Sequence, residues 1–243
     1  TLPSDKNGAT AEELEKSEAN ILMLLPSALS KISVTGLSAR RSAFVKWVEE
    51  EKSRLIIEDD YNGELRYTAR SVTAFQGKCS DKTVYIGSFS KLLLPSVRIA
   101  YMVLPDRLVT KFNERRGVYN QTCGKTEQIA LKNYIETGEL EKHLRRLRKL
   151  YYAKSQHLSC AVKEIIPYAG ITLYESSITA ELDLKLKADS RDICAKKEKK
   201  GLKLLPARGK GCVRLCFAGI SESDILPAIK LLKEISDKKT SLA

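Results

Sequence analysis

The sequence contains no run of eighteen apolar residues, no Cys-x-x-Cys pair, and only two histidines, His143 and His157. Without a long apolar run it has no candidate membrane-spanning helix, so we expect a soluble chain with no membrane partner. The scattered cysteines argue against structural zinc and are typical of a reducing cytoplasm. Repeats and low-complexity linkers are absent as well. With 243 residues, 43% of them hydrophobic, the chain can form one large or two modest domains.

Positive charge is in excess, with a net charge of +12 at pH 7. The basic residues concentrate at 142–154 and 185–203, where they alternate with Leu and Tyr at helical spacing. We therefore interpret most of them as solvated faces of helices. The alternative is non-specific attraction to nucleic-acid phosphates, which would depend on salt. No helix-turn-helix is evident in the sequence.

Apolar runs and helical patterns alternate through the first part of the chain, which favours an α/β sheet. The expected strands there are 20–25, 54–58, 83–87 and 98–104, and the expected helices are 11–19, 38–52, 105–117, 122–137 and 139–165. The remainder has the α+β pattern of a small domain, with strands at 171–184, 201–205 and 211–217 and helices at 189–200 and 221–238. We place the domain boundary near residue 140.

Two buried-type strands end in polar motifs. Residues 54–57 lead into Glu58-Asp59-Asp60-Tyr61, and residues 83–86 lead into Gly87-Ser88-Phe89-Ser90-Lys91, with Arg98 seven residues further on. In open parallel sheets, ligands bind in the crevice beyond the carboxyl ends of the strands. Each motif alone is more often a turn or a solvated loop, but the combination indicates a binding site.

These residue types fit pyridoxal phosphate (PLP). The amine of Lys91 can form a Schiff base with the PLP aldehyde, and a carboxylate, here Asp59, keeps the pyridine nitrogen protonated. Tyr61, two residues beyond Asp59 on the same side of an extended strand end, can donate to the phenolic oxygen. The remaining candidates, as ligands of the phosphate, are Ser88, Ser90 and Arg98.

With these motifs identified, the chain resembles the aminotransferase-like domain of MocR-type regulators in the GntR superfamily. The resemblance is carried by IIEDDYNGELRY (56–67), VYIGSFSKLLLPSVRIAYMVLP (84–105) and GELEKHLRRLRKLYYAKSQHL (138–158). That family uses the three-layer fold type I scaffold of aspartate aminotransferase, a PLP-dependent transferase. The resemblance thus implies a partial α/β large domain at 1–140 and a small α+β domain at 141–243.

The resemblance assigns the same roles to the site residues. It makes Lys91 the Schiff-base lysine, Asp59 the pyridine partner and Tyr61 the phenolic-oxygen partner. It makes Ser88 and Arg98 phosphate ligands, and Ser90 matches the motif. The pair Arg40-Arg41 also matches paired arginines of the family.

A further residue of the resemblance lies in the expected strand 211–217. The family has an arginine there that binds the substrate carboxylate, and Arg214 occupies the position. A bidentate contact would orient the α-carbon of an amino acid toward the cofactor. The alternative interpretation of Arg214 is a strand-edge arginine that faces water.

The resemblance also carries expectations about assembly. Fold type I sites lie at a subunit interface, which implies a homodimer, and DNA contact is implied only through a domain absent from this chain. The sequence begins at Thr1-Leu-Pro-Ser without a methionine. We therefore expect a fragment that lacks the N-terminal part of the scaffold.

Three functions remain open at this stage. In the first, the domain is the effector domain of a transcriptional regulator and senses PLP or an amino compound through Lys91. In the second, it is an active aminotransferase that acts on amino acids, with Lys91 as the proton carrier. In the third, too many cofactor contacts are missing and the chain binds no PLP.

Overall fold

The computed structural model describes residues 2, 4–5, 8–26, 34–67, 73–94, 96–173 and 177–237. The chain divides into two compact units, residues 1–144 and 145–243. The elements of the first unit are β1 (Ser4–Asp5), β2 (Gly8–Ala9), α1 (Ala11–Glu15), β3 (Ile21–Leu24), α2 (Val34–Glu50), β4 (Leu55–Asp59), β5 (Thr83–Ser88), β6 (Ala100–Val103), α3 (Asp106–Arg115) and α4 (Lys125–Glu136), with 3₁₀ turns at Gly63–Leu65, Ser80–Lys82 and Arg116–Val118. The long helix α5 (Glu139–Ile165) begins in this unit and continues in the second.

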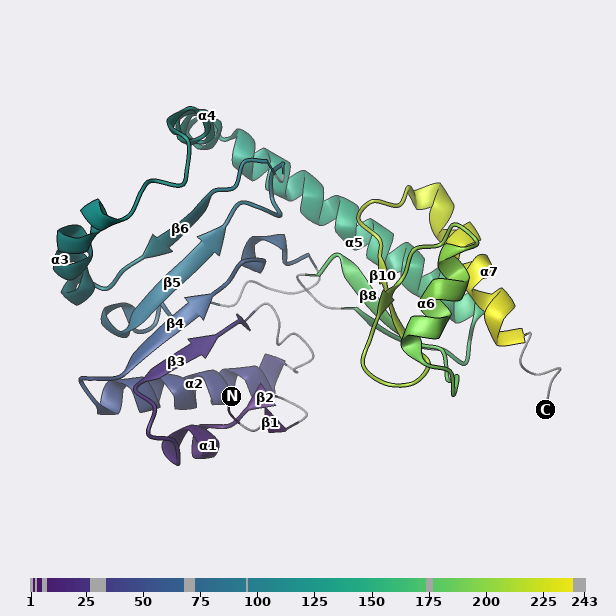
Figure 1. Ribbon diagram of the computed structural model, residues 1–243, viewed down its shortest axis with the longest axis horizontal. Helices are drawn as coiled ribbons and strands as arrows, with labels where there is room; N and C mark the ends of the chain where they lie inside the picture. The colour runs from purple at the N-terminus through teal and green to yellow at the C-terminus, as the bar shows by residue number, and fades with distance from the viewer. Residues whose placement is uncertain are drawn as a thin grey trace. The chain divides into compact units, whose positions relative to one another are not determined.

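The first unit is built on a four-stranded sheet of order β3-β4-β5-β6. β3, β4 and β5 are parallel, and β6 runs antiparallel to β5, as the arrows in Figure 1 show. The connection from β3 to β4 passes through α2, which is the crossover that a parallel pair requires. The carboxyl ends of β4 and β5 therefore lie at the same edge of the sheet.

Helices α1 and α2 cover one face of this sheet. Strand side chains alternate between faces, so Leu22, Leu24 and Ile56 point toward α2, where Trp47 and Val48 are at most 1% exposed. Burying side chains of this size stabilises the fold by about 1.5–3 kcal/mol each. The cluster consists of Leu14, Leu22, Leu24, Phe44, Trp47, Val48, Ile56, Phe75 and Cys79.

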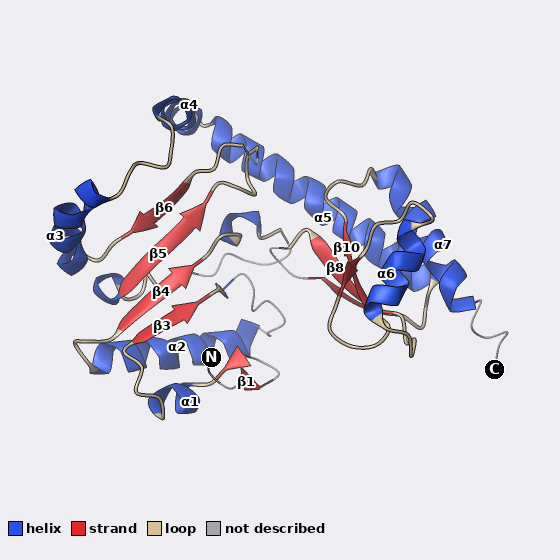
Figure 2. Cartoon of the chain, viewed as in Figure 1, coloured by secondary structure: helices blue, strands red, loops and turns tan. Residues whose placement is uncertain are grey.

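The second unit contains α5 from residue 145, β7 (Gly170–Leu173), β8 (Thr179–Asp183), α6 (Ser190–Glu198), β9 (Leu205–Pro206), β10 (Cys212–Cys216) and α7 (Glu222–Asp237). Its sheet has the order β7-β8-β10-β9, and all neighbouring strands are antiparallel. Figure 2 shows β8 and β10 among the helices of this unit. Its core is formed by one face of the sheet together with apolar positions of the helices, namely Leu158, Ala161, Val162, Ile166, Ala180, Leu182, Ile193, Val213, Leu215, Ile225, Ile229 and Leu232.

Two strand predictions for this unit are wrong. The expected strand 171–184 is two antiparallel strands, β7 and β8, because the chain reverses between Leu173 and Thr179. The expected strand 201–205 is only the two-residue β9, preceded by a turn at Gly201, whose φ of +83° favours glycine. The other expected helices and strands are confirmed, most of them with ends shifted by one to four residues.

Two lysines depart from the expected solvated faces. Lys154 of α5 is 8% exposed, and its ammonium donates to the carbonyls of Ala218 and Ile220 at 2.9 and 2.6 Å. Lys197 of α6 is fully buried, and its ammonium has no hydrogen-bond partner among the residues that the structure describes. The basic stretches are therefore not uniformly solvent-facing.

Other features of the described residues concern membranes, metals and thiols. None of the helices in the described ranges has the length and apolarity needed to cross a membrane. Among the same residues, no group of three or more His, Cys, Asp or Glu side chains could hold a metal ion. All six cysteines are free thiols.

Candidate functional site

Asp59 is the last residue of β4 and stands on the face of the sheet opposite α2. Its neighbour Glu58 points the other way and is buried, whereas Asp59 is half-buried. The register of the parallel pair places Asp59 beside Ile86 of β5. Asp59 is therefore held by two strands at the carboxyl edge of the sheet.

Tyr61 and Lys91 meet at this edge. The Nζ atom of Lys91 lies 5.0 Å from the centroid of the Tyr61 ring, a cation–π distance. The sequence predicted that Tyr61 continues the extended strand, but β4 ends at Asp59 and the chain then enters the 3₁₀ turn Gly63–Leu65. The turn, rather than strand alternation, brings the phenol beside the lysine. Lys91 is exposed at this position.

Ser88 and Ser90 form the start of the segment that carries Lys91. Ser88 ends β5, and its hydroxyl oxygen accepts a hydrogen bond from the Ser90 N–H at 3.1 Å. Because Ile86 is in register with Asp59, Ser88 two residues later points to the same face of the sheet as Asp59. Both serines are half-buried.

Arg98 closes the segment. The Phe89 N–H donates to the carbonyl of Ile99 at 3.0 Å, so the two ends of the loop that carries Lys91 are joined. Arg98 is exposed and has a φ of +47°, a left-handed conformation that costs free energy for a residue other than glycine. The strain sits directly beside the joined ends of the loop.

His143 anchors this loop, and the sequence did not reveal its role. Its Nε2 donates to the carbonyl of Leu92 at 2.8 Å, and the Leu92 side chain is only 4% exposed. The residue after Lys91 is thus held both by packing and by a hydrogen bond from α5. A contact across 51 positions of the chain leaves no local pattern, so sequence reasoning had no signal for it.

A second unpredicted feature lies behind the acidic run. Glu58 and Arg41 form a buried ion pair, with 3.8 Å between Oε1 and Nη2. Glu58 also accepts a hydrogen bond from the Gln76 N–H at 3.1 Å, and the Arg41 guanidinium stacks 3.9 Å from the Phe75 ring centroid. Burial raises the pKa of Glu58 and lowers the pKa of Arg41, and the opposite charge of each partner works against these shifts.

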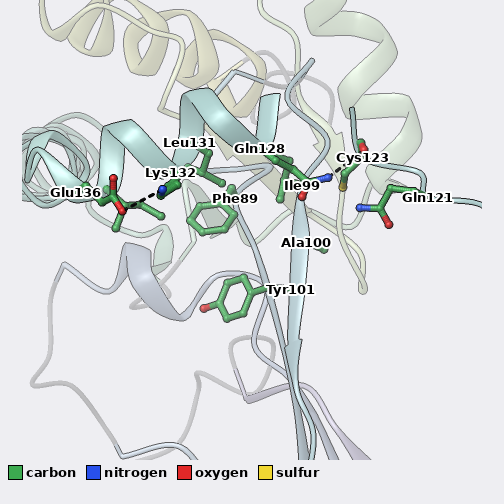
Figure 3. A pocket seen from close by; sticks show the side chains of 11 residues that line it. Phe89, Ile99, Ala100, Tyr101, Gln121, Cys123, Gln128, Leu131, Lys132 and Glu136 are labelled. Atoms are coloured by element: carbon green, nitrogen blue, oxygen red, sulfur yellow. Dashed lines mark hydrogen bonds and ion pairs between the residues drawn. The ribbon is translucent and has the colours of Figure 1, made fainter. Parts of the chain in front are cut away.

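A cavity of about 560 Å³ adjoins the loop (Figure 3). Phe89 and Ile99, which join the loop ends, form part of its wall, and α4 supplies Leu131 and Ile135. A hydrogen bond of 3.1 Å from Gln128 to the Cys123 carbonyl and an ion pair of 3.6 Å between Lys132 and Glu136 lie in this wall. The cavity is mainly apolar and is distinct from the polar edge where Lys91 lies.

Arg214 is in the second unit, on β10, between Glu181 of β8 and Leu205 of β9 in the register. Its side chain is exposed, and the guanidinium donates to the Pro206 carbonyl at 3.2 Å. It lines a cavity of about 500 Å³ in this unit. The other six candidate residues, Asp59, Tyr61, Ser88, Ser90, Lys91 and Arg98, belong to one edge of the sheet in the first unit.

The residue types at this edge fit PLP. The Lys91 amine lies 5.0 Å from the centroid of the Tyr61 ring, and a carboxylate ends the neighbouring strand. Two serines precede Lys91 and an arginine follows it along one closed loop. When bound, PLP would supply an aldehyde that captures amines and a ring that accepts electrons. The amine, the acid and the phosphate-type ligands thus come from the ends of two adjacent parallel strands and from the loop that follows the second.

Comparisons with known proteins bear on the class of protein. No family model matches the chain. It is 36% identical over 241 residues to the uncharacterized HTH-type transcriptional regulator YdeL of Bacillus subtilis, a match that covers 96% of this chain and 52% of YdeL. It is 31% identical over 150 residues to the HTH-type pyridoxine biosynthesis transcriptional regulator PdxR of Corynebacterium glutamicum, which covers 62% of this chain and 33% of PdxR. The chain thus spans about half the length of YdeL and a third of PdxR.

Aminotransferases are also similar to the chain. The aromatic-amino-acid aminotransferase 1 of Thermococcus litoralis is 25% identical over 252 residues, which covers 96% of this chain and 60% of that enzyme. The crystal structure of Pyrococcus horikoshii kynurenine aminotransferase, in complex with PMP, superposes with a TM-score of 0.79 at 25% identity and covers 98% of this chain and 63% of that one.

These matches define the class of protein. The chain has the fold of the fold type I, PLP-dependent aminotransferases, and the predicted fold class is confirmed. Its homologues are HTH-type transcriptional regulators of the MocR type and aminotransferases.

Proposed function

We propose that the chain is the PLP-binding, aminotransferase-like effector domain of a MocR/GntR-type transcriptional regulator. The observation that carries the proposal is the position of Lys91, 5.0 Å from the Tyr61 ring, at the sheet edge where Asp59 ends the adjacent strand. The similarity to YdeL and PdxR supports a regulator rather than an enzyme. YdeL is 36% identical to the chain, whereas the T. litoralis aminotransferase is 25% identical.

Each residue has one task in this proposal. Lys91 captures the PLP aldehyde, Asp59 holds the proton on the ring nitrogen, and Tyr61 donates to the ring oxygen. The phosphate is bound by Ser88, Ser90 and Arg98. Arg214 binds the carboxylate of the amino compound that serves as effector, alone or together with PLP.

The assembly belongs to the same proposal. We propose a homodimer in the cytoplasm, as in fold type I proteins whose site lies between subunits, and DNA contact through a separate domain of the full-length regulator. A ligand switches such a regulator only if it binds its two arrangements with different affinity. The switch would be measured as the affinity of the full-length regulator for DNA with and without PLP and the amino compound.

The test is covalent trapping on Lys91. The chain is mixed with PLP, reduced with borohydride, digested and analysed by mass spectrometry, and we expect a phosphopyridoxyl group on Lys91. Lys91→Ala should lose the trapped group, whereas Lys82→Ala, at a half-buried lysine next to the opposite end of β5, should keep it. A trapped group on another residue in the Lys91→Ala variant would overturn the assignment, and the absence of any adduct in the wild type would favour a chain that binds no PLP.

The second candidate function is a working aminotransferase. It is favoured by the match to the T. litoralis enzyme, which covers 96% of this chain. In this case the amine of Lys91 would carry a proton to and from the α-carbon of the substrate, and PLP, when bound, would supply the electron sink. Sustained keto-acid production from a panel of amino donors would establish the enzyme and overturn the pure sensor.

Arg214 separates cofactor binding from effector binding. Because it lies in the second unit and not on the loop of Lys91, Arg214→Ala should leave PLP uptake unchanged and weaken capture of amino acids. Equal affinity of the variant and the wild type for the same amino acid would count against its role.

A further inference from the structure

The cavity that Arg214 lines has a positively charged wall. The cations Arg191, Arg208, Lys210 and Arg214 line it, and Asp189 is the only acid among the lining residues that the structure describes. Within the described part of the chain, none of these four cations forms an ion pair. Positive charge that is not neutralised in a concave site attracts anions.

The acid in the wall is already engaged. The Oδ1 atom of Asp189 accepts a hydrogen bond from the Arg191 N–H at 2.8 Å and thereby caps the N-terminus of α6. The positive end of the α6 dipole adds to the attraction for an anion at the same place. The balance of charge in the cavity therefore remains positive.

The wall is also rigid. Ser190 is 4% exposed, donates through its hydroxyl to the Cys212 carbonyl at 2.6 Å and accepts from the Ala207 N–H at 2.9 Å, so it ties α6 to both ends of the turn between β9 and β10. Gly209 and Gly211 in that turn have φ values of +101° and +74°. A Cβ at Gly211 would lie 2.5 Å from the Leu186 carbonyl oxygen, so only glycine fits.

This turn holds Arg208 and Lys210 two residues apart on one preorganised loop beside Arg214. Binding sites that are formed before the ligand arrives lose less free energy to ordering. A volume of about 500 Å³ is in the range of sites for small molecules rather than for macromolecules.

We infer that the amino compound recognised by this chain carries a second anionic group, and that Arg208 and Lys210 bind this group while Arg214 binds the α-carboxylate. The inference rests on the proposed function, which assigns Arg214 to the effector or substrate. The shared chemistry of the second group is a carboxylate or a phosphate monoester, both of which the guanidinium fork and the ammonium can bind.

The experiment compares matched pairs of ligands on the PLP-loaded chain by isothermal titration calorimetry. The pairs are glutamate with glutamine, for a carboxylate, and O-phosphoserine with serine, for a phosphate. We expect the acidic member of at least one pair to bind about tenfold or more tightly, because hydrogen bonds to charged groups are the stronger ones. The pair with the larger ratio identifies the group.

Variants assign the preference to the turn. Arg208→Gln combined with Lys210→Gln should reduce the ratio of the affinity for the acidic member to that for the neutral member to less than about threefold. The affinity for the neutral member itself should stay unchanged. Arg208→Lys should retain most of the preference, and Lys203→Gln, at an exposed lysine outside the cavity, should retain all of it. Equal affinity within both pairs, or a ratio that the double variant does not change, would overturn the inference.

Failure of the proposed function is distinguishable from failure of this inference. If the absorbance of PLP shows no uptake by the chain, the proposed function fails, and glutarate, a dicarboxylate without an amine, is titrated instead. Glutarate binding that is lost in the double variant would uphold the anion site. No glutarate binding to the wild type would overturn it.

Discussion

Arg41 and Glu58 form a buried ion pair directly behind the strand end that carries Asp59. The Nη2 and Oε1 atoms are 3.8 Å apart, and the side chains are 7% and 1% exposed. Because successive residues of β4 face opposite sides, Glu58 fixes the strand to α2 while Asp59 is presented on the other face. The acidic run thus combines a structural carboxylate with a candidate functional one.

Breaking this pair should destabilise the first unit strongly. We expect Arg41→Met to cost about 3–5 kcal/mol in urea unfolding, since it leaves Glu58 charged and buried without its partner. The double variant with Glu58→Leu should recover most of the loss, because no buried charge remains. A double variant as unstable as the single one would show that packing of the guanidinium on Phe75, and not its charge, is what matters.

The cost of Arg41→Met should also depend on pH. Burial raises the pKa of Glu58 in the folded state, so the folded protein holds the proton more tightly than the unfolded chain. The resulting contribution to stability is present below the ordinary carboxyl pKa and is lost as pH rises through the raised value. Without Arg41 the pKa of Glu58 rises further. The free energy of unfolding of Arg41→Met should therefore fall below that of the wild type by less near pH 4 than near pH 7. Parallel pH curves for the two proteins would contradict this.

The hydrogen bond from His143 should hold the Lys91 loop in place. His143→Ala leaves the Leu92 carbonyl without its donor, and we expect a loss of about 1–2 kcal/mol together with weaker PLP uptake. Thermal unfolding and a PLP titration measure the two effects. His157→Ala, at the only other histidine, is the matched control and should leave PLP uptake unchanged, since its ring lies near Glu222 in the second unit. Identical PLP affinity in both variants would rule out the anchoring role.

Asp59→Asn should separate binding from chemistry. The amide keeps the shape of the side chain but cannot hold the proton on the ring nitrogen, so PLP should still be trapped on Lys91 by borohydride. If the chain converts an amino donor, the rate should fall by about 100-fold or more, as when a preorganised electrostatic partner is lost. Single-turnover absorbance measures that rate, and an unchanged rate would exclude Asp59 as the pyridine partner.

Lys197 should destabilise the second unit at neutral pH. Its side chain is fully buried, and its ammonium has no hydrogen-bond partner within the described ranges. Burial, with a contribution from the nearby charge of Lys200, therefore lowers the pKa of Lys197. We expect Lys197→Met to raise the free energy of unfolding by about 1–3 kcal/mol at pH 7. The ion pair between Lys200 and Glu234, at 2.6 Å, stays intact in this variant.

The sign of its pH dependence follows from the lowered pKa. As pH falls below the ordinary pKa of lysine, Lys197 takes up its proton in the unfolded chain before it does so in the folded protein. This difference favours unfolding. The stability difference between Lys197→Met and the wild type should therefore shrink as pH rises toward 10. A constant difference across that range would show that Lys197 has its ordinary pKa in the folded protein.

The sequence by itself determined the class of fold and predicted the residues of the candidate site. Apolar runs at 54–57 and 83–86, each followed by polar residues, were enough to predict two parallel strands with Asp59 and Lys91 at their ends, because strand pattern and motif are both local. The helix starting at Glu222 was likewise predicted from the pattern that begins at Ser221.

Only the tertiary structure decided how those residues are supported. The ion pair of Arg41 with Glu58 and the hydrogen bond from His143 to Leu92 join residues 17 and 51 positions apart, and no local periodicity records such contacts. The same holds for Lys197, which stands in a basic stretch that looks solvated but is fully buried. Local patterns specify which way a segment folds, whereas burial and pairing depend on what the rest of the chain places beside it.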